Sequence, residues 1–367
     1  MFQASAGSWV VSGALCRKTP RGISGYCRDM PDAVDWNLAA TLGARVVGGG
    51  PRLSPDEANE VVAELYYLAG EATPLVQETT GLHQYLPSEV KVVDRAEWIR
   101  SNLDSFRRIS APLTERLETA SAFTREVGSR ATGAQLGLVL GFVGSRVLGQ
   151  FEIFTEDDPR LLLVAPNIVE IERQLQVKPR DFRLWVCVHE QTHRIQFAAA
   201  PWLTGYLLEN IHEYMGLSDM STGELFGRLA GAVRAVRSGD EPDGVIGALQ
   251  SPEQKQVFDR LTAVMSLLEG HADVVMDEVG PQAIPTVKVI RAAFQYRRAA
   301  GTSGWEGFLR RVLGMDLKAR QYAQGASFVR AVMADGGMPR LNAVWESADH
   351  LPTRAEIEDP TQWLARV

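Results

Sequence analysis

Hydrophobic residues recur at helical spacing over most of the chain after residue 33. In the segment that follows Ser54 and Pro55, the apolar positions Val61, Leu65 and Leu68 lie three or four residues apart, on one face of a helix. Serine is a favoured N-cap and proline is favoured in the first turn, so a helix is predicted to begin here. The pattern also predicts helices over 95–103 and 112–127 and a mostly helical second half, with breaks at Pro201, 238–244, Gly280-Pro281 and 301–304.

Strand signals are few and short. Runs of β-branched and aromatic residues that predict strands occur at 90–94, 151–154 and 161–165. The sequence contains no internal repeat that would indicate a solenoid. These patterns together predict a fold that is mainly α with a small β-sheet, of the α+β class.

The most apolar run, residues 131–151, is predicted to be a buried helix. Polar residues interrupt it and leave about ten apolar positions, too few to span roughly 30 Å of hydrocarbon. Glycines 133, 137 and 141 recur at every fourth position, which allows another helix or strand to approach closely. The sequence therefore predicts no membrane association.

Three regions are predicted along the chain. Residues 1–32 are rich in Gly, Ser and Pro without clear periodicity, and are expected to form a poorly determined N-terminal lead-in. Residues 33–200 are expected to form an N-terminal lobe, and 201–367 a helical C-terminal lobe.

Composition narrows the functional classes. Of 367 residues, 45% are hydrophobic, and 38 basic against 45 acidic side chains give a net charge of −7, which lacks the basic footprint of a nucleic-acid-binding protein. The three cysteines have no spacing typical of a thiolate metal site. Because an odd number of cysteines cannot all form disulfides, a reducing compartment is expected. The N-terminus has no basic residue before its short apolar stretch, unlike a secretory signal. We therefore expect a cytoplasmic protein.

One motif predicts metal chemistry. Residues 181–197 are predicted to form a helix with Asp181 as N-cap, and this helix contains His189-Glu190-Gln191-Thr192-His193. Two histidines four positions apart lie on the same helix face and can share one Zn²⁺ ion. Glu190 lies beside the first histidine, where a carboxylate can take a proton from water. We therefore predict His189 and His193 as zinc ligands and Glu190 as the general base.

The alternative interpretation is a helix with two ordinary surface histidines. A surface pair would lie on a polar face, but apolar residues flank the motif on both sides. This predicts a helix that is buried nearly all round, and buried imidazoles need partners. The flanking apolar residues are Val186, Cys187, Val188, Ile195 and Phe197.

A third ligand is predicted from the apolar helix around residues 261–280. A capping-box pattern at Ser251 marks its start, and Gly280-Pro281 marks its end. Glu269 and Asp273 are four residues apart on one face of this helix, where charged groups are costly unless they meet a cation. We predict Glu269 as the third ligand, with Asp273 holding a ligand histidine through its second ring nitrogen.

Two alternatives remain open at this helix. His271 could be the third ligand instead of Glu269. The two are alternatives, because on a helix their side chains point about 200° apart and would not bind the same ion. Glu269 and Asp273 could also form an ordinary solvated face.

At these residues the sequence resembles the bacterial zincin-like metallopeptidase family, whose members are mostly assigned as hydrolases by motif. One branch of that family is associated with biosynthesis of a deazaflavin coenzyme. The resemblance covers most of the chain and is carried by 34–36, 92–98, 147–154, 161–168, 189–197, 267–277, 318–328 and 351–363.

The resemblance implies a zincin-like fold with a helical C-terminal lobe. It implies His189, His193 and Glu269 as ligands of Zn²⁺ and Glu190 as the base, with no other cofactor. It implies no particular substrate.

An oxyanion donor is also expected, because a carbonyl attacked by water develops negative charge. Tyr322 is the first candidate, since tyrosine donates a hydrogen bond without bringing charge. A core-packed tyrosine is the alternative interpretation of this residue. Weaker candidates for the donor are His271, Arg297, Arg298 and Arg320.

The remaining motifs predict structure. His83, His212 and His350 are isolated, and the glycines at 48–50 lack the lysine context of a phosphate-binding loop. They are interpreted as structural histidines and a turn.

Two hypotheses follow. The first is a zinc-dependent hydrolase that cleaves a peptide or other amide bond with metal-activated water. The second is an inactive metal-binding or scaffold protein that retains the fold. The presence of Glu190 favours the first, because a structural zinc site has no need of a base.

Overall fold

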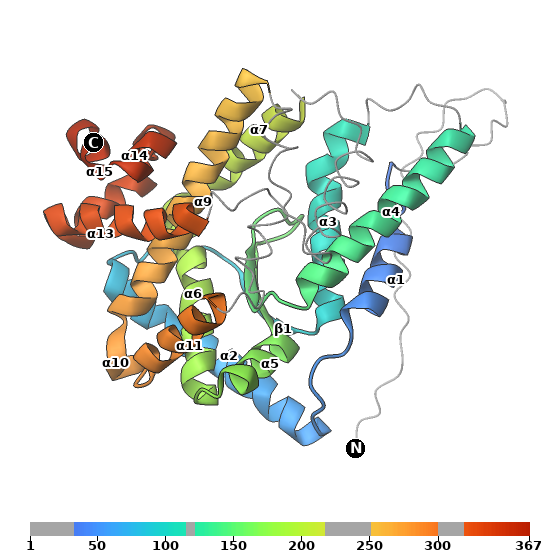
Figure 1. The fold of residues 1–367 in the computed structure, drawn as a ribbon, viewed down its shortest axis with the longest axis horizontal. Helices are drawn as coiled ribbons and strands as arrows, with labels where there is room; N and C mark the ends of the chain where they lie inside the picture. Colours follow the sequence, from blue (N-terminus) through green and yellow to red (C-terminus); the bar gives the residue numbers. More distant parts are fainter. Residues whose placement is uncertain (1–32, 115–121, 217–250, 300–318) are drawn as a thin grey trace, which may run out of the picture. The chain divides into compact units, whose positions relative to one another are not determined.

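A small sheet lies at the centre of the described helices (Figure 1). The structure, a computed structural model, describes residues 33–114, 122–216, 251–299 and 319–367. The described sheet has the order β1-β3-β2, with β1 parallel to β3 and β2 antiparallel to it. The three predicted strands are confirmed, with ends one or two residues away. Their bounds are β1, Glu89–Val93; β2, Gly149–Glu152; and β3, Arg160–Val164.

Helices make up most of the remaining described residues, which confirms the predicted α+β class. Those of the first half are α1 (Trp36–Val47), α2 (Pro55–Thr80), α3 (Arg95–Thr114), α4 (Ala122–Gly144), α5 (Ala165–Leu175) and α6 (Pro179–Ala199). Those of the second half are α7 (Leu203–Gly216), α9 (Pro252–Glu278), α10 (Gly280–Ala283), α11 (Val287–Ala299), α13 (Ala319–Leu341), α14 (Arg354–Glu358) and α15 (Pro360–Arg366). Two 3₁₀ turns lie at Asn342–Trp345 and Ala348–His350.

Two predicted helices have different bounds in the structure. The helix predicted over 131–151 ends at Gly144, and β2 begins at Gly149. A separate helix over 112–127 was expected because proline favours a first helical turn. In the structure Pro112 lies inside the last turn of α3, which continues to Thr114, and α4 begins only at Ala122. Residues 115–121 lie outside the described part of the chain.

Capping boxes fix the starts of α2 and α9, the two longest described helices. The sequence predicts the box at Ser251, and at Ser54 it predicts the serine N-cap. The backbone N–H of Ser54 donates to Glu57 Oε2 (2.7 Å), and the backbone N–H of Ser251 donates to Gln254 Oε1 (2.9 Å). Each serine Oγ accepts a hydrogen bond from the backbone N–H three residues ahead. Both caps satisfy donors that a helix start otherwise leaves free.

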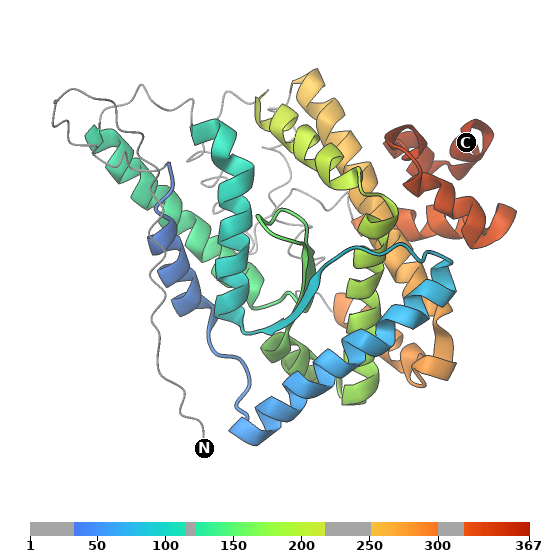
Figure 2. The ribbon, with the colours of Figure 1, turned by 180° about the vertical axis from the view of Figure 1, so that it is seen from behind.

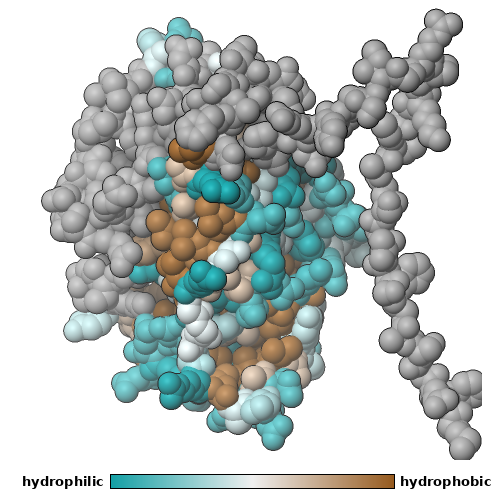
Figure 3. Space-filling view, turned by 90° about the vertical axis from the view of Figure 1, so that its right-hand side faces the viewer, coloured by the Kyte–Doolittle hydropathy of each residue, from teal (hydrophilic) through white to brown (hydrophobic). Residues whose placement is uncertain are grey.

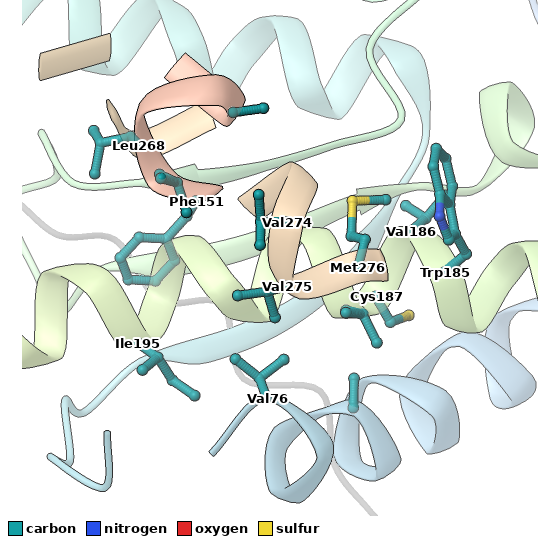
Figure 4. Packing of buried hydrophobic residues seen from close by; sticks show 14 of the residues in the cluster. Val76, Phe151, Trp185, Val186, Cys187, Ile195, Leu268, Val274, Val275 and Met276 are labelled. Carbon is teal, nitrogen blue, oxygen red and sulfur yellow. The ribbon is translucent and has the colours of Figure 1, made fainter. Parts of the chain in front are cut away.

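Helix α6 lies in the core, between the sheet, α2 and α9. Figure 1 shows α9 crossing α6, and Figure 2, from behind, shows α2 passing across α6 on the other side. The close view in Figure 4 shows Cys187 of α6 beside Val275 and Met276 of α9, with Val76 of α2 below. Because α6 is covered on several sides, nearly all of its residues are buried.

The glycines of α4 allow α1 to pack directly on its backbone. A Cβ atom on Gly137 would lie 2.6 Å from the Ala39 carbonyl oxygen, and one on Gly133 would meet the Asp35 carbonyl equally closely. The predicted close approach at this glycine repeat is therefore confirmed, and the partner is α1.

A second close crossing joins α9 and α13. A Cβ atom on Gly270 or on Gly325 would come closer than 3.0 Å to the backbone of the other helix, at Ala326 and Ser266 respectively. Backbone atoms cannot move aside as a flexible side chain can, so both positions require glycine. Gly270 lies between Glu269 and His271, which fixes both of these residues at the crossing.

The predicted division into lobes at residue 200 stays a prediction. The predicted lead-in, 1–32, lies outside the described residues. None of the described helices is long and apolar enough to cross a membrane. The face of the molecule in Figure 3 carries apolar areas interrupted by polar side chains.

Gly270→Ala should destabilise the protein by about 1–3 kcal/mol or more, because the added methyl group overlaps the α13 backbone. Gly70→Ala is the matched control: Gly70 is an exposed glycine of α2 whose Cβ would meet nothing within 4 Å. The control should be neutral or stabilised by up to about 1 kcal/mol from helix propensity. Urea unfolding of both variants provides the measurement, and a Gly270→Ala variant as stable as the wild type would contradict the crossing.

Candidate metal centre

The paired histidines lie in the middle of α6, where the helix crosses α9. The helix begins at Pro179 with Lys178 as the N-cap, so the predicted cap at Asp181 is wrong. Asp181 is in the first turn, and its carboxylate instead accepts hydrogen bonds from the backbone N–H and hydroxyl of Thr286 (3.0 and 2.6 Å). This contact ties the start of α6 to the α10–α11 connection.

Three potential ligand atoms converge at the crossing. The Nε2 atoms of His189 and His193 are 3.1 Å apart, and each lies 3.7 Å from a carboxylate oxygen of Glu269. Among the described residues, these three side chains form the group of His, Cys, Asp and Glu residues that could hold a metal ion. Their side chains are 27%, 13% and 24% exposed, so an ion or a substrate could reach the group from solvent.

The geometry of this group fits a tetrahedral zinc ion. Ligand atoms 2.0–2.2 Å from a tetrahedral ion lie about 3.3–3.6 Å from one another, close to the observed 3.1 and 3.7 Å. Burial, the neighbouring His193 and the positive charge of Arg291 hold the pKa of His189 well below its usual range. A neutral imidazole is the form that binds a metal, so the donor set suits Zn²⁺.

Glu190 is buried next to this group. A Cβ atom on Gly149, at the start of β2, would lie 2.6 Å from the Glu190 carboxyl carbon, so a larger residue at this position would displace the carboxyl from its observed place. Burial, together with the negative charge of Glu269, raises the pKa of Glu190 well above its usual range. A carboxyl with a raised pKa is suited to accept and release a proton near neutral pH.

The second ring nitrogens of the two histidines also have partners. His189 Nδ1 lies 3.3 Å from the sulfur of Met276 in α9, and His193 Nδ1 lies 2.9 Å from Gln196 Oε1 in α6. Both contacts hold the rings so that the Nε2 atoms face Glu269.

The structure does not give Asp273 the role that the sequence predicts. Its carboxylate pairs with the guanidinium of Arg291, which also donates to Asp277. The partner comes from α11, and sequence spacing within α9 could not reveal it. Asp273 therefore connects α9 to α11 and makes no contact with either histidine. The solvated-face alternative describes Asp273 only in part, since its side chain is 37% exposed but ion-paired.

His271, the alternative third ligand, lies elsewhere. It is fully buried, and its Nδ1 is 3.0 Å from Gln196 Nε2. Burial and the nearby His193 lower the pKa of His271 to about 3, so the ring is neutral. His271 is thus connected to the convergent group through Gln196 and is not a member of it.

The oxyanion donor stays a prediction. Tyr322 belongs to the first turn of α13, three residues before Gly325, but its side chain lies outside the described part of the structure, as do those of Arg297, Arg298 and Arg320.

The isolated histidines lie away from the candidate metal centre. His83 is exposed, while His212 and His350 contact the backbone carbonyls of Ile109 (3.1 Å) and Ala343 (2.9 Å). These contacts fit their interpretation as structural residues.

Sequence reasoning missed the residues that support the group. Gln196 carries one signal, because a polar side chain in an apolar helix stretch needs a buried partner. The contact of Met276 with the His189 imidazole was likewise not predicted. Gly149 and Arg291 carry no local signal, since their roles depend on the packing of separate elements.

Glu190→Gln should change how stability depends on pH in the metal-free protein. The folded wild type keeps Glu190 protonated above pH 4.5, where an unfolded glutamate ionises, so the folded state holds more protons over this interval. Wild-type stability therefore falls as pH rises from about 4.5 toward the raised pKa, and the glutamine variant escapes this loss. Urea unfolding across this range should show a stability gap that widens with pH and then levels off. A constant gap would contradict the raised pKa.

Comparisons with known proteins confirm the resemblance seen in the sequence. The model of the zincin-like metallopeptidase family matches residues 34–364. The structure is similar to the crystal structure of a "putative hydrolase with a novel fold" from Chloroflexus aurantiacus, with 30% identity, a TM-score of 0.66, and coverage of 91% of this chain and 98% of that chain. A search of curated proteins gives no significant match. Because the family model spans nearly all of the described fold, the chain belongs to the zincin-like metallopeptidase family.

Proposed function

We propose that the protein is a zinc-dependent hydrolase that cleaves a peptide or other amide bond. The observation that carries this proposal is the convergence of two imidazole nitrogens and a carboxylate beside a buried second carboxylate, Glu190. Membership of a zincin-like metallopeptidase family and similarity to a structure described as a hydrolase support a hydrolytic reaction.

In this proposal His189, His193 and Glu269 hold Zn²⁺. Three protein ligands leave a fourth position open, which is typical of catalytic zinc and not of structural zinc, where four protein ligands close the site. Bound zinc would polarise a carbonyl group and lower the pKa of water toward neutrality. The partial exposure of all three ligands is consistent with an open position that faces solvent.

Glu190 acts as general base and then as general acid. Its carboxylate takes a proton from the attacking water, and the same carboxyl later gives that proton to the departing amine. The raised pKa favours this double role, because the two protonation states of Glu190 are then closer in free energy near neutral pH. Gly149 leaves the space that the carboxyl occupies, because it has no side chain there.

The position of β2 favours an extended peptide as substrate. This strand is at one edge of the described sheet, and its first residue, Gly149, contacts Glu190. An extended peptide that paired with such an edge would carry successive amide groups past Glu190.

Glu190→Gln tests the proposed base. The variant should keep zinc, because Glu190 is not a ligand, and should lose turnover by about 10²–10⁴-fold, the usual contribution of a positioned acid–base group. Zinc content and cleavage of a peptide library, read by mass spectrometry, provide the measurement. His83→Ala, which removes an exposed histidine that is not part of the group, is the control and should retain both properties.

His193→Ala tests the ligands in the same assays and should lose both zinc and turnover. Unchanged activity in Glu190→Gln would contradict the role of the base. Stoichiometric zinc without hydrolysis of any peptide or small amide by the wild type would favour the second hypothesis, a metal-binding scaffold.

A further inference from the structure

Gln196 is a fully buried polar residue that links His193 to the interior of the protein. It lies three residues after His193 on α6 and points toward α9. Its side chain makes three contacts: Oε1 with His193 Nδ1 (2.9 Å), and Nε2 with the Leu268 carbonyl oxygen (2.9 Å) and with His271 Nδ1 (3.0 Å). The amide therefore uses both of its ends in the core.

The Leu268 carbonyl fixes which end of the amide is which. A carbonyl oxygen only accepts hydrogen bonds, so the group that faces it must be the NH₂ of Gln196. The oxygen of the amide must then face His193. This orientation follows from the hydrogen-bond partners of the amide alone.

The orientation of Gln196 sets the tautomer of His193. The oxygen of the Gln196 amide can only accept a hydrogen bond. His193 Nδ1 must therefore carry a proton and donate it to this oxygen. In the neutral ring the other nitrogen, Nε2, is then the one without a proton, and it faces His189 and Glu269. A metal ligand requires this tautomer.

His271 completes the arrangement from the far side. Its Nδ1 accepts the second N–H of the Gln196 amide, which leaves the ring proton on Nε2. That nitrogen is buried without a hydrogen-bond partner among the described residues, and the ring packs on Trp345 at 5.4 Å between centroids. His271 is next to Gly270, so the close crossing of α9 and α13 fixes its position.

We propose that Gln196 and His271 form a positioning pair that holds His193 in its metal-binding tautomer and orientation. Gln196 fills the place that a carboxylate takes in many zinc sites, but brings no charge into the core. His271 and the Leu268 carbonyl together hold the NH₂ end of the amide, so that its oxygen faces His193. This inference rests on the proposed zinc site and concerns how the site is preorganised.

Gln196→Met tests the pair through zinc affinity. Methionine keeps the volume of glutamine and removes the acceptor, so the dissociation constant for Zn²⁺ should rise about 10–100-fold, as expected for loss of such a partner. Titration of the metal-free protein with zinc against a chromophoric chelator measures it.

Gln191→Met is the matched control. Gln191 is a buried glutamine of the same helix, but its amide donates to the Ala69 carbonyl of α2 (2.8 Å), away from the group. The control loses a comparable buried hydrogen bond and should bind zinc as the wild type does. Equal zinc affinity in a folded Gln196→Met variant and the wild type would overturn the proposal, as would equal losses in both variants.

The tautomers provide an independent test in the metal-free wild type. Long-range proton–nitrogen correlation spectra should show the proton on Nδ1 of His193 and on Nε2 of His271. A proton on Nε2 of His193 would overturn the inference, and this result decides the matter even if Gln196→Met does not fold. A wild type that binds no zinc but shows the expected tautomers would contradict the proposed function and leave the positioning pair supported.

Discussion

The crossing of α6 and α9 determines how close the paired histidines come to Glu269. A zinc ion tolerates only a few tenths of an ångström in the separation of its ligands, so two helices that are distant in sequence must pack at a fixed distance. Apolar packing of α9 on α6 supplies part of this constraint. The glycine contact with α13 supplies the rest, because α9 is held from its other side at Gly270, directly beside Glu269. The same contact fixes His271, so the proposed ligand Glu269 and the proposed positioning pair share one support.

The polar side chains at this crossing lie in a mostly apolar part of the fold. They differ in how far their surroundings compensate for the loss of water. Gln196 is satisfied at both ends by hydrogen bonds. Arg291 is held by Asp273 and Asp277 at the edge of the core. Glu190 differs, because burial and Glu269 oppose its ionisation and raise its pKa. Burying this carboxyl near a second carboxyl lowers the stability of the folded state. The same surroundings make Glu190 a better proton acceptor, and enzymes often combine lower stability with higher reactivity in this way.

Local signals account for the parts that the sequence predicted. The capping boxes at Ser54 and Ser251 involve residues three apart, and the strands are short apolar runs, so both are visible without knowledge of the fold. Glu269 was identifiable because a carboxylate is costly in an apolar helix. The partner of Asp273 was not, because Arg291 comes from another helix. The roles of Gln196, Met276 and Gly149 likewise depend on which elements meet in three dimensions.

X-ray absorption at the zinc edge of the zinc-loaded protein tests the central claim most directly, because it reports the identity and distance of the ligands. The account predicts four-coordinate zinc with two imidazole nitrogens at about 2.0–2.1 Å, one carboxylate oxygen at about 2.0–2.2 Å and one further light atom. A sulfur ligand, fewer than two imidazoles or a shell of six oxygens would contradict the assignment of His189, His193 and Glu269.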